Sequence, residues 1–315
     1  MTDLEVRKLR FGFADAAVPF LWNEANPTFS SGANALSLFA IAFEKMIGTA
    51  VHEAMPLITD TVVAEEAQAF VRQEGQHSMA HRQHAKGLIK SHPALQETLD
   101  AVIAVFDDLT ASTSLTYRLA YIADLEATFA PAFTMMLDNA DTLFATGDDR
   151  VASLFLWHFV EEMEHRSSAL RIYDAVVSNP TYRTRVAPSV FRHVASAMRI
   201  AAEGFNEYVP IEIRKVDATS IFAGEGWKRK LSKKLPFLRK YPLFDVPDHG
   251  PFERPYPHVP LRDQLATSYG IVRSQIPGHD PAGHELPGLA REWLARYDAG
   301  YDVTRWYTAA TSKPA

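Results

Sequence analysis

Two pairs of residues, Glu74–His77 and Glu162–His165, each place a carboxylate three residues before an imidazole. Residues at this spacing share one face of an α-helix, so both side chains of a pair can reach the same metal ion. Glu44 and Glu126 add one carboxylate each from two other predicted helices. A glutamate from each of two helices and a Glu-x-x-His pair from each of two more form a ligand set that holds two metal ions inside a helical bundle.

These potential ligands interrupt helical stripes that are otherwise apolar. One stripe, in which every step is three or four residues, is Leu115, Leu119, Ile122, Glu126, Phe129 and Phe133. A second stripe brings three potential ligands together and runs Val151, Phe155, His158, Glu162, His165, Ala169, Ile172 and Val176. A buried carboxylate without a partner is strongly unfavourable, so several of them facing one core require positive charge. Metal ions supply this charge most simply. For each acid taken alone, the alternative is an exposed or salt-bridged position at the edge of its stripe.

Two assignments in this set stay open. Glu161 can replace Glu162 as a ligand, but Glu162 keeps the Glu-x-x-His spacing and is preferred; Glu161 and Glu164 are then surface groups or partners of the ligands. His81, four residues after His77, is an extra ligand, a hydrogen-bond partner of a ligand, or a core histidine, and we favour the last two. Structural or solvent-facing positions are expected for three further residues, His52, His84 and Asp124.

The order of the motifs resembles that of the ferritin-like di-iron carboxylate superfamily. His158, four residues before Glu162, is similar to the additional histidine in the seven-ligand site of the di-iron arylamine N-oxygenases. The strings QEGQHS (73–78) and WHFVEEMEH (157–165) more closely resemble a bacterial family labelled "predicted metal-dependent hydrolase", over roughly residues 20–210. The resemblance implies two iron ions, Fe–Fe or Mn–Fe, on seven ligands: Glu44, Glu74, His77, Glu126, His158, Glu162 and His165.

Mixed imidazole and carboxylate ligation suits iron or manganese, and seven ligands favour oxygen chemistry over the hydrolysis that the family label names. The resemblance therefore predicts a non-heme di-iron oxygenase or oxidase, a monooxygenase-like oxidoreductase. It would use O2 to oxidise a small, largely apolar organic substrate, with N-oxygenation as one form. Because no Gly-rich nucleotide or flavin motif is present, an external electron donor is expected.

Two competing hypotheses come from other classes. One is a metal-dependent hydrolase, in which the metal lowers the pKa of a bound water molecule. The other is a ferroxidase-like metal-binding protein. Aromatic residues near the ligands either line an apolar substrate cavity or pack the core, and core packing is favoured for each alone: Phe39, Phe43, Phe70, Phe129, Phe133, Phe155 and Trp157.

Composition excludes several other classes. The chain has 315 residues, of which 47% are hydrophobic and 22% charged, a globular balance with length enough for a real core. It contains no cysteine, which excludes disulfides, thiolate metal sites and thiol catalysis. The net charge of −6 argues against nucleic-acid binding. No uninterrupted apolar run reaches the roughly 18 residues of a spanning helix, and the N-terminus does not resemble a signal peptide, so a cytoplasmic protein is expected.

The pattern predicts an all-α fold, a ferritin-like helical bundle over residues 1–210 that carries the metal site. Helical stripes, the N-cap Asp60 and breaks at proline or glycine place helices at 33–54, 61–91, 94–107, 112–146, 148–179 and 188–207. Pro131 is expected to kink the fourth of these. Residues 242–287 contain nine of the 19 prolines, so 211–315 is predicted to be an irregular, loop-rich extension packed on the bundle.

Residues 227–241, with the sequence WKRKLSKKLPFLRKY, contain seven basic residues and no acidic one. The favoured interpretation is a solvated connector. The alternatives are contact with an acidic electron-transfer partner or, through Trp227, Leu231, Leu235 and Phe237, with an anionic membrane surface. Pro236 argues against one continuous amphipathic helix. The expected partners are thus a small-molecule substrate, O2 and an electron donor but no nucleic acid, and the pattern allows a homodimer.

Overall fold

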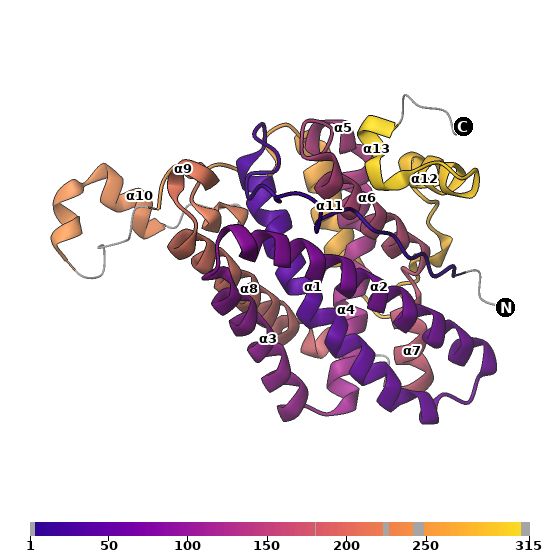
Figure 1. The fold of residues 1–315 in the computed structure, drawn as a ribbon. Helices are drawn as coiled ribbons and strands as arrows, with labels where there is room; N and C mark the ends of the chain where they lie inside the picture. The colour runs from indigo at the N-terminus through magenta and orange to yellow at the C-terminus, as the bar shows by residue number, and fades with distance from the viewer. Residues whose placement is uncertain (1–3, 180, 223–226, 242–248, 310–315) are drawn as a thin grey trace.

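The structure is a computed structural model, and it describes residues 4–179, 181–222, 227–241 and 249–309. Within these residues every regular element is helical and no strand occurs, which confirms the all-α prediction. Figure 1 shows the longer helices gathered into one bundle. Their bounds are α1 Pro27–Ala54, α2 Thr61–Ser91, α3 Leu95–Ser112, α4 Leu115–Asp138, α6 Asp149–Glu164, α7 Ser168–Val176 and α8 Tyr182–Tyr208.

Several helices begin where a side chain caps the first free backbone amides. Asp60 accepts hydrogen bonds from the amides of Val62 and Val63 at the start of α2, which confirms the predicted N-cap. Asp148 caps α6 in the same way, and the Ser114 hydroxyl accepts from the third residue of α4. These caps fix the starts of three of the helices that carry the potential ligands.

Three predicted helix boundaries were wrong. The first helix begins at Pro27 and not at 33, because proline is favoured in the first helical turn and the small polar residues after it are buried. The helix predicted over 112–146 ends at Asp138 and is followed by the short α5, Ala140–Leu143. The helix predicted over 148–179 is two helices, because α6 ends at Glu164 and α7 begins at Ser168.

The break between α6 and α7 lies directly at the metal-ligand motif. His165 is the C-cap of α6, with φ −96° and ψ 14°. The Arg166 guanidinium donates to the carbonyl oxygen of Met163 in the last turn of α6. Ser168 donates to the buried carboxylate of Glu66 on α2 and so fixes the start of α7. The stripe predicted to run from Val151 to Val176 therefore changes direction after His165.

Two further predicted boundaries were wrong, by five residues at the end of the third helix and by six at the start of the last helix of the bundle. The third helix runs on to Ser112, and α8 begins at Tyr182 and passes through Pro188. Helix α4 continues through Pro131, and the kink there stays a prediction.

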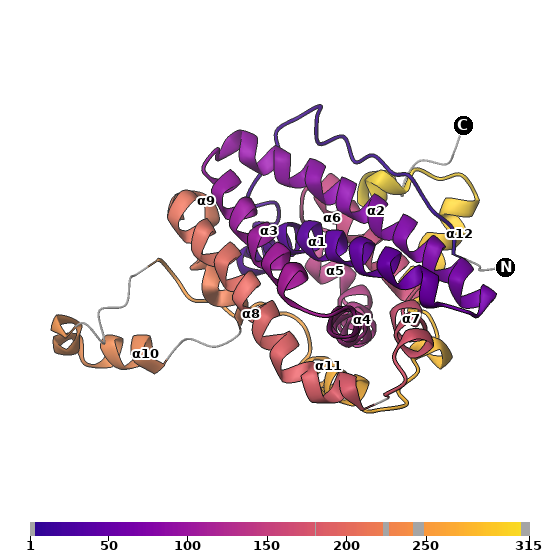
Figure 2. The same ribbon diagram turned by 90° about the horizontal axis from the view of Figure 1, so that it is seen from below.

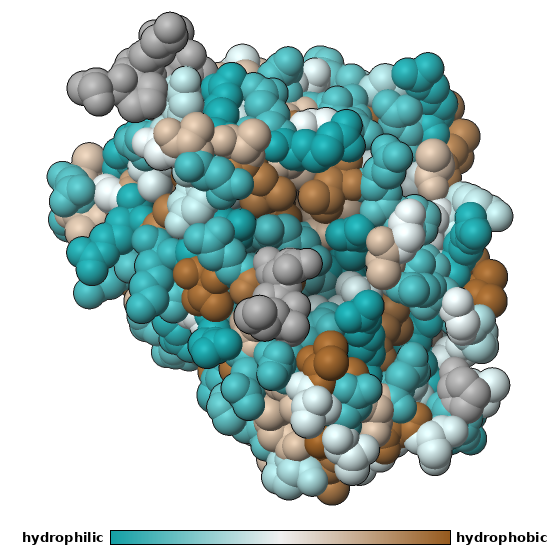
Figure 3. Space-filling model, turned by 90° about the vertical axis from the view of Figure 1, so that its right-hand side faces the viewer, coloured by the Kyte–Doolittle hydropathy of each residue, from teal (hydrophilic) through white to brown (hydrophobic). Residues whose placement is uncertain are grey.

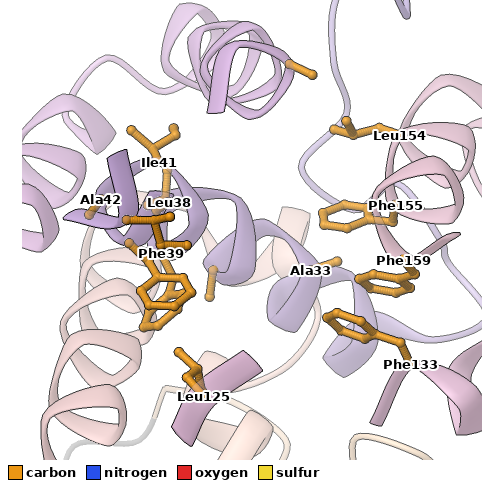
Figure 4. Packing of buried hydrophobic residues seen from close by; sticks show 14 of the residues in the cluster. Ala33, Leu38, Phe39, Ile41, Ala42, Leu125, Phe133, Leu154, Phe155 and Phe159 are labelled. Atoms are coloured by element: carbon orange, nitrogen blue, oxygen red, sulfur yellow. The ribbon is translucent and has the colours of Figure 1, made fainter. Parts of the chain in front are cut away.

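The core is one continuous cluster of buried apolar side chains that extends from Phe11 to Trp306. Figure 4 shows Phe133, Phe155 and Phe159 layered beside α6, while Leu38, Phe39 and Ile41 of α1 lie on the opposite side of the view. The rings of Phe133 and Phe159 stack with centroids 4.0 Å apart and an interplanar angle of 13°. This packing holds α1, α4 and α6 at fixed positions around the centre of the bundle.

The chain beyond residue 210 contains short helices joined by loops: α9 Ile211–Arg214, α10 Trp227–Lys234, α11 Leu261–Ser274, α12 Gly288–Asp298 and α13 Trp306–Ala309, with 3-10 turns at Ala218–Phe222, Pro236–Lys240, Pro281–Gly283 and Val303–Arg305. A further 3-10 turn, Met55–Leu57, follows α1. In Figures 1 and 2, α10 lies apart from the bundle. Helix α11 packs on α4 so closely that a Cβ atom on Gly270 would come within 2.7 Å of Pro131. The division into a bundle over 1–210 and an extension over 211–315 stays a prediction.

In the part of the chain that the structure describes, one helical segment, Pro27–Leu57, is long and apolar enough to span a membrane, and 72% of its most apolar window is buried inside the protein. This burial is compatible with α1 being the core helix of a soluble protein. The cytoplasmic location stays a prediction.

Candidate metal centre

The structure brings the seven predicted ligands together between α1, α2, α4 and α6. Glu74, Glu126, Glu162 and His165 form one group whose potential ligand atoms all lie within 4.8 Å of one another. Three overlapping groups lie beside it: Glu44, Glu74 and His77; His77, His158 and Glu162; and Glu44, His81 and His158. Every member is buried, with Glu44 the most exposed at 5%.

Individual distances show how closely the side chains face one another. His165 Nε2 lies 3.1 Å from Glu74 Oε1, 3.2 Å from Glu162 Oε2 and 3.8 Å from Glu126 Oε2. His158 Nε2 lies 2.9 Å from Glu162 Oε1 and 3.8 Å from Glu44 Oε1. His77 Nδ1 lies 3.8 Å from Glu74 Oε2, so Glu74 and Glu162 each face a histidine on both sides of the cluster.

Many of these buried polar atoms have no hydrogen-bond partner. They include both carboxylate oxygens of Glu44 and of Glu126, and one atom from each of four other residues: Glu74 Oε1, Glu162 Oε2, His77 Nδ1 and His165 Nε2. Buried polar groups are normally satisfied, because an unpaired group loses its hydration without compensation. Oxygen and imidazole nitrogen atoms that converge in this way fit metal cations as their missing partner.

The electrostatics of the cluster also favour a bound cation. Burial and the nearby carboxylate of Glu74 raise the pKa of Glu44 well above its usual range. Burial and the carboxylates of Glu162 and Glu74 do the same to the pKa of Glu126. Burial opposes the charge of Glu162, but contacts with His165 and His158 outweigh it and lower the pKa of that carboxyl. Four carboxylates in one dry pocket cannot all ionise without added positive charge.

Each of the three predicted histidine ligands is held through its second ring nitrogen. His77 Nε2 lies 2.9 Å from Glu161 Oε2, and Arg7 donates to Glu161 Oε1 at 3.1 Å. His165 Nδ1 lies 3.1 Å from Gln73 Oε1, and the Gln73 amide donates to the backbone oxygen of Glu5. Such contacts fix the ring orientation of metal-binding histidines.

The third histidine begins a longer chain of hydrogen bonds. His158 Nδ1 lies 2.8 Å from His81 Nε2, and the Ser37 hydroxyl joins His81 Nδ1 to His84 Nδ1 at 2.9 and 2.8 Å. His81 thus contacts a predicted ligand and also belongs to one of the metal-binding groups. Burial lowers the pKa of His84 to about 3, so that ring is neutral and structural.

The structure also shows the positions of the other acidic residues and histidines that were considered from the sequence. Glu161 lies outside the metal-binding groups, paired with His77 and Arg7, whereas Glu162 belongs to two of them. Glu164 pairs with Arg7 at 2.5 Å. Asp124 is buried and pairs with Arg183, and the His52 side chain is exposed and bonds the Gly48 carbonyl.

Sequence reasoning missed three residues that support the centre: Arg7, Ser37 and Gln73. Gln73 lies directly before Glu74 in the sequence. Its supporting role is evident only in the folded chain, where its amide donates to the backbone oxygen of Glu5 in the N-terminal segment. Arg7 is 154 residues from Glu161, and no periodic pattern connects the two. Arg7 is also covered by the rings of Trp293 and Tyr297 from α12, at 5.8 and 5.0 Å from their centroids.

A small cavity adjoins the carboxylates. Its volume is about 10 Å³, which is the space of a single water molecule. Its polar side is formed by Glu44, Glu74, Glu126, His158 and Glu162. The apolar side is made by Leu36, Phe39, Ala40, Phe43, Phe129 and Phe133. Four of the seven aromatic residues singled out in the sequence therefore line this cavity. Phe70, Phe155 and Trp157 pack in the core.

A larger pocket of about 360 Å³ lies between α4, α11 and the loop around residues 279–285. Met163, directly after Glu162, and Thr134 of α4 form part of its wall. Helices α4 and α6 thus carry predicted ligands on one face and line this pocket with another.

Comparison with known proteins gives one match. A family model described as "Predicted metal-dependent hydrolase" matches residues 5–240, about three quarters of the chain. No curated protein and no solved structure matches the chain. The match overturns the expectation of an O2-dependent, monooxygenase-like oxidoreductase, because the family is described by hydrolysis and not by oxidation. The label that we set aside in favour of oxygen chemistry is the one that the comparison supports. With its buried glutamate and histidine cluster, the chain belongs to the family of predicted metal-dependent hydrolases.

Proposed function

We propose that this protein is a metal-dependent hydrolase whose metal ions are held by seven residues: Glu44, Glu74, His77, Glu126, His158, Glu162 and His165. The observation that carries the proposal is the set of buried carboxylate and imidazole atoms that face one another without hydrogen-bond partners. The family match supports the reaction class.

Two metal ions fit this donor set better than one. The group of Glu74, Glu126, Glu162 and His165 would hold the first ion. The second would be held by Glu44, His77 and His158, each of which belongs to two of the three overlapping groups beside it. Glu74 and Glu162 belong to groups on both sides, so these two carboxylates would help to hold both ions. Carboxylate and imidazole donors suit iron or manganese, and we propose an Fe–Fe or Mn–Fe pair.

When bound, such ions would lower the pKa of a water molecule towards neutrality and so supply the nucleophile for hydrolysis. The residues of the chain contribute by orienting the metal-binding side chains and by excluding water from them. Glu161, Gln73 and His81 hold the three histidine rings at their outer nitrogens. The rings of Phe39, Phe43, Phe129 and Phe133 keep bulk water from the carboxylates and give the cavity an apolar wall. This wall favours a substrate with an apolar group beside the bond that is cleaved.

The test begins with metal-free protein reloaded with Fe(II), Mn(II) or Zn(II), in which metals per chain are counted. Anaerobic turnover is then followed with chromogenic esters and amides that carry apolar acyl groups. We expect two ions per chain and hydrolysis without O2. If no metal form hydrolyses any ester or amide in the panel, the hydrolase proposal is wrong.

The ligand assignment has its own test. Glu126→Ala and His165→Ala should each lose one ion per chain. Asp124→Asn is the matched control, because it changes a buried carboxylate that pairs with Arg183 and lies outside the metal-binding groups. If both ligand variants still hold two ions, the assignment fails even where the protein proves to be a hydrolase.

A further inference from the structure

Exposed apolar side chains are concentrated in one part of the chain. Among the described residues, twelve large apolar side chains are exposed, and eight of them lie between residues 235 and 276. The face seen in Figure 3 is mostly hydrophilic, and its hydrophobic side chains are scattered. Contiguous exposed apolar surface marks a site of interaction with another body.

Five of these side chains form a stripe along α11 and the turn after it. Leu261, Leu265, Tyr269, Val272 and Ile276 follow one another at steps of three or four residues, and each is between 56% and 68% exposed. At 3.6 residues per turn they lie within about 80° of arc. Because α11 packs on α4 with its Gly270 side, this stripe is the face turned away from the bundle.

The other three lie at the end of the basic segment 227–241. Leu235, Phe237 and Tyr241 are exposed, and so are the neighbouring Lys230, Lys234 and Lys240. As Pro236 led us to expect, this segment is not one helix, because α10 ends at Lys234 and a 3-10 turn begins at Pro236. Figure 2 shows α10 and α11 both towards the lower edge of the view.

We propose that the α11 stripe and the 227–241 segment together form a docking surface for an anionic lipid bilayer. Apolar side chains that enter the lipid and lysines that meet anionic headgroups are the two signals that peripheral membrane binding requires. A second copy of the chain would satisfy the α11 stripe, but it would leave seven basic residues without an acidic counterpart in their own segment. The lipid surface accounts for both features.

Docking in this way would also affect the larger pocket. Tyr269 and Arg273 of α11 are exposed on this side of the helix and also line the pocket of about 360 Å³. A docked protein therefore presents the rim of this pocket to the bilayer.

The experiment is cosedimentation of the full chain with vesicles of phosphatidylcholine, or of an equimolar mixture with phosphatidylglycerol. We expect strong binding only to the mixed vesicles, and weaker binding at high salt. Replacing three lysines (Lys230→Gln, Lys234→Gln, Lys240→Gln) should weaken partitioning on the order of 100-fold, since each contributes about fivefold. Leu265→Ser with Val272→Ser should weaken it on the order of tenfold or more.

The matched control is Val62→Ser with Met79→Ser, which removes two exposed apolar side chains of α2 outside the surface. The control should bind vesicles as the parent chain does, and all variants should keep the parent circular dichroism and metal content. Equal vesicle binding by parent, lysine and α11 variants would overturn the proposal. The proposal would also be overturned if the α11 variant bound vesicles as the parent does but had a different mass in sedimentation velocity. The stripe would then be a contact between copies of the chain.

Discussion

The residues that bind and support the proposed metal ions differ in how far they can be recognised. The ligands repeat at three- and four-residue steps, so helix periodicity alone places them on inward faces. Their supporting partners do not repeat. Arg7, Gln73 and Ser37 reach the cluster from positions set by tertiary packing. Arg7 binds Glu161, Gln73 contacts His165, and Ser37 joins His81 to His84.

Arg7→Met is expected to weaken metal binding by about 10- to 100-fold, because Glu161 would lose the cation that holds it against His77. Arg7→Lys should recover part of the loss. The measurement is competition for the metal against a chelator of known affinity. Arg118→Met is the control, since Arg118 is equally buried but pairs with Glu53 away from the cluster. Equal metal affinity in the Arg7→Met and parent proteins would show that Glu161 keeps its position against His77 without Arg7.

Metal loading is also expected to release protons. Burial opposes the charge of His77, but its hydrogen bond with Glu161 and the nearby carboxylate of Glu74 outweigh it and raise its pKa to about 10 in the metal-free protein. The ring is then protonated at pH 7 and must lose its proton to bind metal, so affinity falls as pH falls. Titration calorimetry in buffers of different ionisation enthalpy measures the release. His77→Ala should release fewer protons, and an equal number in both proteins would argue against His77 as a ligand.

At the scale of helices, the sequence predicts which helices form better than it predicts where each helix begins and ends. The Asp60 cap and the stripes of α4 and α6 follow from local rules and appear as expected. The break in the helix after Glu164 does not follow from local rules, because the residues that produce it are distant in sequence. Glu66 accepts a hydrogen bond from Ser168, 102 residues away in sequence. Backbone oxygens of the loop at 281–284 accept hydrogen bonds from the guanidinium of Arg166. A helical pattern can continue through such a point, but tertiary hydrogen bonds stop the helix there.

Asp148 offers a test at this scale. It caps α6 and pairs with Arg150, which also donates to the backbone oxygens of Ala16 and Ala17. Asp148→Ala should cost about 0.5–2 kcal/mol, the usual value for a helix N-cap. Asp60→Ala, which removes a cap without an arginine, should lie nearer the lower end. Urea unfolding measures both, and a smaller loss for Asp148→Ala would mean that the arginine link adds nothing.

The same residue predicts a pH dependence. Although burial opposes its charge, hydrogen bonds from Arg150 lower the pKa of Asp148 below its usual value of 3.8. A carboxyl with a lowered folded-state pKa stabilises the fold above its unfolded value and loses that contribution as pH falls through the folded one. The difference in unfolding free energy between parent and Asp148→Asn should therefore shrink below about pH 4. A difference that stays constant down to pH 2 would exclude the charge as its source.

At the scale of the whole molecule, the end of the chain is joined to the helices that carry the ligands. The Trp306 amide donates to Ser153, and the Tyr307 amide to Asp149, both on α6. From α12, Trp293 and Tyr297 cover Arg7 and are in turn connected through it to Glu161. Side chains from the N-terminal segment, the ligand helices and α12 thus share one buried network.

This arrangement predicts a single cooperative unfolding transition of the metal-free protein. Because one apolar cluster contains Trp22 and Trp157 as well as Trp293 and Trp306, the described part of the extension shares its core with the bundle and should melt with it. Helix content in the far ultraviolet and tryptophan fluorescence should then change together with denaturant. Two separated transitions would instead indicate that residues 211–315 form an independent unit. A Trp306→Phe variant would then identify the part that melts first, because it removes one reporter from the extension and leaves both in the bundle.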